Sequence, residues 1–247
     1  MKATVVVDSF PERAPAYVDG YAIVAVDVIR ATTTAVTAVA AGRRCFPVPS
    51  LDAARLLHES LGDALLVGEL GGRMPAGFAL NNSPAAVAAR GDVSRPVILL
   101  SSSGTRLIHA ARGCEATYVA CLRNAAATAR YLVGRHARVA VLGAGSGSDF
   151  RKEDQLCCAW IAADLLDMGY EPGSRRTAAI VERWRGAPAG AGADGKSADY
   201  LRRSGQLQDL AFVLAHVNDL DAACVVEQDE IVQLPAPQEP GRAAQGM

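Results

Sequence analysis

Long apolar runs, an excess of charge of either sign and aromatic side chains are all scarce in this chain of 247 residues. No stretch approaches the roughly 18 consecutive apolar residues that a membrane-spanning helix needs. The net charge of −1 offers no basic surface for nucleic acid or for an anionic membrane. The first residues lack a charged segment followed by an apolar one, so no secretory signal is expected. These absences predict a soluble, cytoplasmic protein with neither nucleic acid nor membrane as a partner.

Cysteine and histidine patterns typical of metal or redox sites are missing as well. The six cysteines include no CxxC pair, which disfavours a zinc ribbon and a thioredoxin-like redox motif. Cys157 and Cys158 lie in an apolar stretch and are expected to be small buried side chains. The four histidines show no HxxxH spacing. Zinc is therefore not expected.

Short apolar runs alternate with stretches rich in Ala and Leu, and this alternation is typical of an α/β fold. Strands are predicted at Thr4–Val7, Ala22–Val26, Cys45–Val48, Ala64–Val67, Val97–Leu100, Ala116–Val119, Ala137–Leu142, Ala178–Val181 and Ala223–Glu227. Helices are predicted at Thr32–Ala41, Leu51–Ser60, Pro84–Arg90, Thr105–Arg112, Asn124–Arg135 and Glu153–Asp167, and in two pieces, broken at Gly205, within Ser197–His216.

The segment from Arg185 to Lys196 is rich in Gly, Ala and Pro and has no apolar face, so it is predicted to be an exposed, mobile loop. Residues 235–247 consist largely of Pro, Gln, Gly and Ala and are predicted to form a disordered tail. No composition shift marks a boundary before them. We therefore predict a single α/β domain over residues 1–234.

The segment DVIRATTT, Asp27 to Thr34, is the most informative stretch because it joins a buried-strand pattern to an Ala-rich helical one. Backbone N–H groups at a helix start stabilise an anion. Asp27 offers carboxylate oxygen to a hard cation, and Arg30 offers a planar fork to phosphate or sulfonate oxygens. This turn favours a metal-assisted site for a small anionic substrate, although a salt bridge and helix-capping threonines would give the same pattern.

Polar residues follow other predicted strands too, at the carboxyl ends where layered α/β folds collect functional groups. Glu69 leaves the strand 64–67 as a second candidate ligand, and Asn82 and Ser83 precede Pro84 as either helix caps or ligand contacts. The run SSSGT, residues 101–105, provides hydroxyls and a glycine suited to phosphate, but it lacks the lysine and spacing of a P-loop.

The run GAGSGS after the strand 137–142 does not match a dinucleotide-binding fingerprint, because its third glycine is misplaced and a helix follows instead of a second strand. Asp149, Glu153 and Asp154 come next. They either ligate a cation or simply place negative charge in the first turn of a helix. Arg123 and Asn124, after the strand 116–119, form a further and thinner candidate.

Taken in order, these loops resemble the 2-phosphosulfolactate phosphatase family, magnesium-dependent acid phosphatases of coenzyme M biosynthesis. The matching segments are DVIRATTT, GE at Gly68–Glu69, GFALNNSP at Gly77–Pro84, SSSGT, the Arg123–Asn124 loop and GAGSGSDFRKED ending at Asp154. They span about the first two-thirds of the chain. The resemblance implies a three-layer α/β/α sandwich around a mixed, largely parallel sheet. It also implies hydrolysis of (R)-2-phospho-3-sulfolactate to 3-sulfolactate and phosphate.

Carried over position by position, the resemblance implies a Mg²⁺ site at Asp27, Glu69 and Asp154, with Arg30 as a further catalytic residue. The expected substrate-binding residues are Thr32, Thr33, Asn82, Ser83, Ser102, Ser103, Gly104, Thr105, Arg123 and Asn124. Candidates for the sulfonate are Arg73, Arg106 and Arg123, with no basis for choosing among them. The chain departs from the family pattern at Ser103, where an Asn is expected, and at Asn81, where a Gly is expected.

Two other functions remain open. A phosphomonoesterase for another small phosphorylated hydroxy acid would differ only in its substrate, and a non-catalytic anion-binding protein would bind phosphate without magnesium-dependent turnover. A phospho-aspartyl mechanism is disfavoured because Ile29 stands where a second Asp would be needed. The expected partner is a small anionic phosphorylated substrate, and a homo-oligomer is left open.

Overall fold

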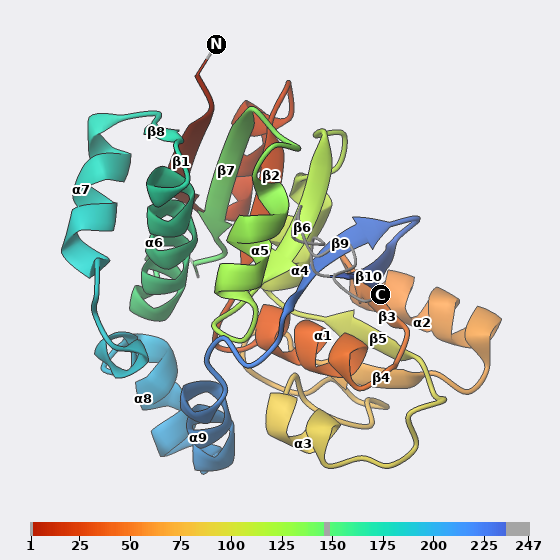
Figure 1. The fold of residues 1–247 in the computed structure, drawn as a ribbon. Coiled ribbons are helices and arrows are strands. Elements are labelled where there is room, and N and C mark those ends of the chain that lie inside the picture. The colour runs from red at the N-terminus through yellow and green to blue at the C-terminus, as the bar shows by residue number, and fades with distance from the viewer. Residues whose placement is uncertain (1, 146–148, 236–247) are drawn as a thin grey trace, which may run out of the picture.

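In the computed structural model, which describes residues 2–145 and 149–235, one ten-stranded sheet runs through the molecule with helices packed against it (Figure 1). The strands are β1 Thr4–Ser9, β2 Ala22–Val26, β3 Cys45–Val48, β4 Leu65–Gly68, β5 Val97–Leu100, β6 Ala116–Ala120, β7 Arg138–Gly143, β8 Glu171–Pro172, β9 Ala222–Glu227 and β10 Glu230–Pro235. The helices are α1 Ala31–Ala40, α2 Leu51–Leu61, α3 Pro84–Ala88, α4 Gly104–Ala110, α5 Ala125–Leu132, α6 Lys152–Asp167, α7 Arg175–Trp184, α8 Lys196–Arg203 and α9 Leu207–Ala215, with 3₁₀ turns η1 Pro11–Tyr17 and η2 Ala189–Gly192.

The strand order is β4-β5-β3-β10-β9-β6-β2-β7-β1-β8. On one side of the hairpin β9–β10, the strands β4, β5 and β3 run parallel to one another, and on the other side β6, β2, β7, β1 and β8 do the same. The hairpin pairs antiparallel with β3 and with β6 and so joins the two parallel parts. The mixed, largely parallel α/β sheet expected from the sequence is thereby confirmed.

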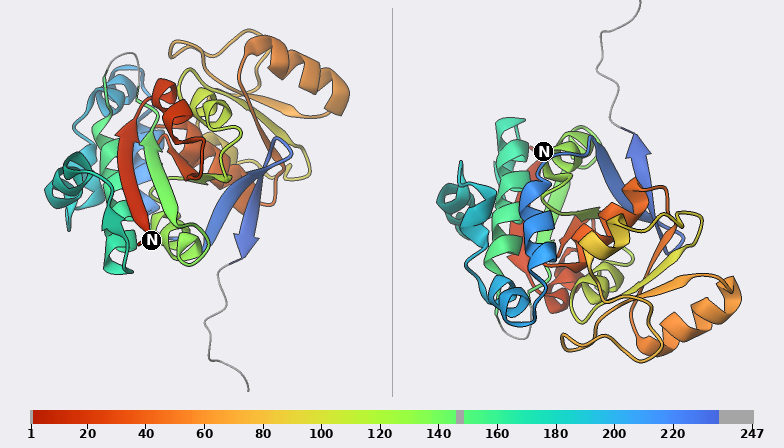
Figure 2. Two further views of the ribbon diagram at one scale, coloured as in Figure 1. Left: turned by 90° about the horizontal axis from the view of Figure 1, so that it is seen from above. Right: turned by 90° about the horizontal axis from the view of Figure 1, so that it is seen from below.

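Alternation along β2 shows how the sheet is covered on both faces. Val24 and Val26 belong to the core that contains residues of α5, α6 and α7, whereas Ile23 and Ala25 belong to the core that contains residues of α1 and α4. Successive side chains of a strand point to opposite faces, so a continuous apolar run such as AIVAV is what a strand with helices on both faces requires. Figure 2 shows these helical layers from above and from below the view of Figure 1.

One predicted strand, Ala178–Val181, is wrong because the segment lies inside α7. Thr177, Val181 and Trp184 are the buried residues of α7, at the i, i+4, i+7 spacing of an amphipathic helix. The short apolar run fits the period of a helix as well as that of a strand. Such runs are ambiguous between strand and helix without the flanking residues.

Two strands were not predicted from the sequence. β8 consists of only two residues at the sheet edge, and β10 pairs with β9 across a turn at Gln228 and Asp229, both of which have positive φ angles. A two-residue turn with two positive φ angles is the type that joins antiparallel strands tightly. Of the predicted tail, Pro235 ends β10, and residues 236–247 lie outside the described residues. Among the described helices, none is long and apolar enough to cross a membrane.

Candidate active site

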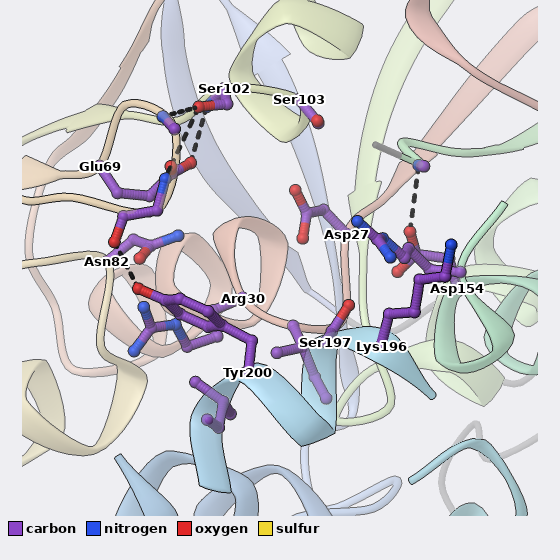
Figure 3. Close-up of a pocket in the computed structure, with 16 residues that line it drawn as sticks. Asp27, Arg30, Glu69, Asn82, Ser102, Ser103, Asp154, Lys196, Ser197 and Tyr200 are labelled. Carbon is purple, nitrogen blue, oxygen red and sulfur yellow. Dashed lines mark hydrogen bonds between the residues drawn. The ribbon is translucent and has the colours of Figure 1, made fainter. Parts of the chain in front are cut away.

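A cavity of about 280 Å³ lies where the loops after β2, β4, β5 and β7 meet the start of α6 and helix α8 (Figure 3). Parallel strands end at one edge of a sheet, so loops distant in sequence converge there. The predicted site residues that line it are Asp27, Arg30, Glu69, Asn82, Ser102, Ser103 and Asp154. The polar and charged residues that the sequence placed in four separate loops therefore share one cavity.

Asp27 and Asp154 are the two buried carboxylates among the residues that line this cavity. Asp154, in the first turn of α6, accepts hydrogen bonds from the backbone N–H of Val28 at 2.8 Å and of Gly145 at 3.3 Å. Burial, together with the negative charge of Asp27, raises the pKa of Asp154 well above its usual value. Burial also raises the pKa of Asp27 to about 7, despite a hydrogen bond from Ala31 N–H. Two like charges in a desolvated place favour either a proton or a cation.

Gly104 explains how the β5–α4 loop approaches Asp27. A Cβ atom at this position would lie 2.5 Å from Asp27 Oδ2 and 2.6 Å from Ala31 Cβ. Any side chain would push this loop away from the α1 turn, so Gly104 acts through close packing and does not itself line the cavity.

Glu69 is held by the loop it belongs to and by the loop after β5. Its Oε1 accepts from Ser102 N–H at 2.7 Å, and its Oε2 accepts from Gly72 N–H at 2.7 Å and from the Ser102 hydroxyl at 3.0 Å. Among residues 2–145 and 149–235, no group of three His, Cys, Asp or Glu side chains is arranged to hold a metal ion. Glu69, Asp27 and Asp154 thus share the cavity without forming a closed three-carboxylate cage.

Arg30 is fixed by helix α9 and the turn before it. Its Nη1 donates to Gln206 Oε1 at 2.5 Å and to Asp209, and the side chains of Arg30 and Asp209 are only 4% and 0% exposed. Asp209 also accepts from the Ser83 hydroxyl, and Ser83 in turn caps α3 by accepting from Ala86 N–H at 3.0 Å. Ser83 therefore positions Arg30 indirectly and does not line the cavity.

Three predicted hydroxyl ligands instead stabilise their own turns. The Thr32 hydroxyl donates to the Asp27 carbonyl at 2.9 Å, and the Thr33 hydroxyl donates to the Val28 carbonyl at 2.7 Å. The Thr105 hydroxyl donates to the Ser101 carbonyl at 3.0 Å. None of the three lines the cavity, because a short hydroxyl at a helix start finds its nearest partner in the preceding backbone.

Arg123 and Asn124 also lie outside the cavity lining. Arg123 pairs with Asp219 at 2.7 Å and donates to the Thr37 hydroxyl at 3.0 Å. Asn124 accepts from Cys121 N–H at 2.9 Å within its own loop. These contacts connect the β6–α5 loop to α1 and to the segment before β9.

Sequence reasoning missed Arg151 and the contribution of helix α8 to the cavity. Arg151, Lys196, Ser197 and Tyr200 line the cavity, and the Tyr200 hydroxyl donates to the Gly72 carbonyl across it. The exposed loop predicted for residues 185–196 is wrong in part, because Gly192, Ala193 and Gly195 are buried. A Cβ atom on Gly192 would lie 2.8 Å from Glu153 Cα, so these glycines let the loop pack directly on α6. The abundance of glycine in residues 185–196 was the only sequence feature that pointed to this close packing.

Comparison with known proteins adds an independent finding. A family profile described as 2-phosphosulpholactate phosphatase matches residues 8–230. The chain is 38% identical over 147 residues to a probable 2-phosphosulfolactate phosphatase of Carboxydothermus hydrogenoformans, covering 59% of this chain and 61% of that protein. It is 31% identical over 245 residues to one of Synechococcus sp. strain JA-2-3B'a(2-13), covering 96% of each, and 32% identical over 213 residues to one of Deinococcus radiodurans, covering 84% of each.

Proposed function

Because the chain belongs to the 2-phosphosulpholactate phosphatase family, we propose that it hydrolyses (R)-2-phospho-3-sulfolactate to 3-sulfolactate and phosphate, with Mg²⁺ as its cofactor. This would make it a cytoplasmic phosphoric monoester hydrolase of coenzyme M biosynthesis. The observation that supports this function most directly is the convergence of Asp27, Asp154 and Arg30 on one small cavity. Two buried carboxylates would repel a phosphate ester unless a cation lay between them and the ester.

The residues present fit Mg²⁺ by their chemistry. Carboxylate oxygen is the donor that a hard divalent cation prefers, and a cation beside Asp27 and Asp154 would stabilise their ionised forms and so offset the effect of burial on their pKa values. Mg²⁺ usually keeps several waters and takes only one or two protein carboxylates directly. Such a site needs no cage of three carboxylates. Asp27 and Asp154 would be the direct ligands. Glu69, in the loop after β4, would contribute its negative charge to the same site.

When bound, the cation would supply positive charge to the phosphoryl oxygens as a Lewis acid. Arg30 would bind the phosphoryl group through the part of its fork not engaged by Asp209 and Gln206, and this anchoring fixes its orientation before the substrate arrives. The Ser103 hydroxyl, in the lining beside Gly104, would donate to a further phosphoryl oxygen. Phosphoryl transfer depends mainly on such positioning and charge stabilisation.

Release of inorganic phosphate from (R)-2-phospho-3-sulfolactate tests this function directly. We expect turnover with Mg²⁺, loss of turnover after chelation and recovery when Mg²⁺ is restored. Asp27→Asn keeps the shape of the side chain but removes its charge, so turnover should fall by on the order of 100-fold or more. Asp52→Asn, at an exposed position in the first turn of α2, is the matched control and should keep the wild-type rate.

The same assay, together with a measurement of phosphate binding, separates the alternatives. Faster hydrolysis of a phosphorylated hydroxy acid without a sulfonate would replace the proposed substrate, while phosphate binding without any turnover would indicate an anion-binding protein. Chelator-resistant hydrolysis would exclude the proposed Mg²⁺ requirement.

A further inference from the structure

The cavity contains a guanidinium group that the proposed phosphate chemistry does not use. Arg151 immediately precedes α6 and lines the cavity, and its Nη1 atom is buried. Within the described residues, this nitrogen has no hydrogen-bond partner. Buried N–H donors in proteins are nearly always paired, so an unpaired donor on a residue that lines a cavity is one that the protein itself leaves unused.

The acidic residues around Arg151 do not pair with it. Asp149 forms its ion pair with Lys196, and no hydrogen bond joins Glu153 to Arg151. Lys152, the next residue along the chain, pairs instead with Asp194 at 3.1 Å. Among the described residues, Arg151 thus forms no ion pair, although its charge also acts on Asp149 and Glu153, and it can donate to an anion that enters the cavity.

The arginines considered from the sequence for a sulfonate are placed elsewhere. Arg106 pairs with Glu12 at 3.3 Å and Arg123 pairs with Asp219, and neither lines the cavity. Arg73 is also absent from the lining. The cationic side chains that do line it are Arg30, Arg151 and Lys196, and Arg30 is held by Asp209.

The cations are distributed on two sides of the cavity. Arg30 is anchored by α9, whereas Arg151 precedes α6 and Lys196 begins α8. In Figure 3, Lys196 appears beside Asp154, and Arg30 appears beside Tyr200 and Asn82. A cavity of about 280 Å³ lies at the lower end of ligand-site volumes. It suits a molecule of few carbon atoms whose two acidic groups reach both sides at once.

We infer that Arg151, assisted by Lys196 at the rim, forms the subsite for the sulfonate of the substrate, which also carries a phosphate and a carboxylate. This inference rests on the proposed function and extends it from the phosphate to the rest of the molecule. A sulfonate has three acceptor oxygens and a single negative charge. It matches a planar guanidinium in charge and in hydrogen-bonding geometry.

Paired substrates provide the test. The ratio of kcat/KM for (R)-2-phospho-3-sulfolactate to that for 2-phospholactate, which lacks the sulfonate, measures recognition of that group alone. In Arg151→Met this ratio should fall by about tenfold or more, because a charge-assisted contact is lost in a desolvated place. Lys152→Met removes a charge from the neighbouring position outside the cavity and should leave the ratio unchanged.

A binding measurement distinguishes failure of the subsite from failure of the proposed function. Calorimetric titration with 3-sulfolactate and with lactate needs no turnover, and Arg151→Met should weaken only the first. If the wild type binds 3-sulfolactate through Arg151 yet hydrolyses neither ester, the subsite stands and the proposed function fails. If both esters lose rate equally in Arg151→Met, or if the ratio is unchanged, the subsite is wrong.

A second variant covers the case in which Arg151→Met does not fold, as judged by thermal unfolding. Arg151→Lys keeps the positive charge but loses the planar fork, so the ratio should fall less than in Arg151→Met but still measurably. An unchanged ratio in Arg151→Lys, together with unchanged 3-sulfolactate affinity, would overturn the inference.

Discussion

At the scale of single residues, Asp27 shows how a site can oppose the stability of its own fold. Its carboxylate is buried next to other acidic groups, and its pKa is raised from its usual value of 3.8 to about 7. A raised carboxylate pKa means that the folded protein binds a proton more tightly than the unfolded chain does. Stability therefore decreases as the pH rises through the interval between the two pKa values.

Asp27→Asn should accordingly stabilise the metal-free protein while it abolishes turnover. The gain in the free energy of unfolding should be absent below pH 4 and should grow between about pH 4 and 7. Above pH 7 it should stay constant, reaching at least about 1 kcal/mol at pH 8. Denaturant unfolding of both proteins in chelator at pH 4, 6 and 8 measures the difference. An equal loss of stability at all three pH values would show that Asp27 stabilises the folded protein and is not placed there to bind a cation.

At the scale of elements, α9 contributes Asp209, a buried side chain that does not line the cavity. Asp209 accepts hydrogen bonds from Arg30 and Ser83 and so links α9 to the turn before α1 and to the start of α3. Tyr200 on α8 makes a comparable link to the loop after β4. Helices α8 and α9 thus fix the positions of the loops that line the cavity, and α8 also lines it.

Removing the charge of Asp209 should therefore damage both stability and catalysis. Asp209→Asn leaves Arg30 buried without its counter-charge, so the free energy of unfolding should fall by about 3 kcal/mol, and kcat/KM should fall because Arg30 is no longer fixed. Chemical denaturation and steady-state kinetics measure the two effects. Asp199→Asn on α8 is the control, since its pair with Arg202 is exposed and worth at most about 1 kcal/mol. Equal behaviour of the two variants would contradict this role of Asp209.

At the scale of the whole molecule, the hairpin β9–β10 makes one sheet of two parallel parts. Val225 of β9 is paired with Tyr118 of β6, and Ile231 of β10 is paired with Cys45 of β3. Glu69 and Ser102 come from the part that contains β4 and β5, and Asp27 and Asp154 come from the part that contains β2 and β7. The cavity therefore depends on a junction formed by the last described residues of the chain.

Truncation of Ile231 tests this junction. Its side chain is buried in the same core as Val67 and Leu107, so Ile231→Ala should cost about 2 to 5 kcal/mol of unfolding free energy. Because the sheet is continuous, we expect a single transition that coincides in far-UV dichroism and fluorescence. Leu56→Ala, at an exposed position on α2, should change little. Two separate transitions in Ile231→Ala would mean that the parallel parts unfold independently.

Local sequence patterns predicted most of the elements that form the sheet. The bounds of β2, β3 and β5 were predicted to the residue, because apolar runs with sharp polar ends mark buried strands. The division of α8 from α9 was correctly expected at Gly205, which has a positive φ angle. The prediction of a strand at Ala178–Val181 was wrong, because four consecutive apolar residues fit the period of a strand and that of a helix equally well. β10 was not predicted, because this segment becomes a strand through its pairing with β9 and β3 and not through a local sequence pattern.

The sequence by itself determined that Asp27, Glu69 and Asp154 would follow strands, and parallel strand ends necessarily meet at one edge of a sheet. The tertiary structure alone decided which neighbours these residues have. The anchoring of Arg30 by Asp209, the approach of Arg151 and Lys196 and the position of Arg123 outside the cavity join residues far apart in the chain. Local patterns record which face of an element is buried. The packing of distant elements decides which polar side chains share a cavity, and no short segment encodes that packing.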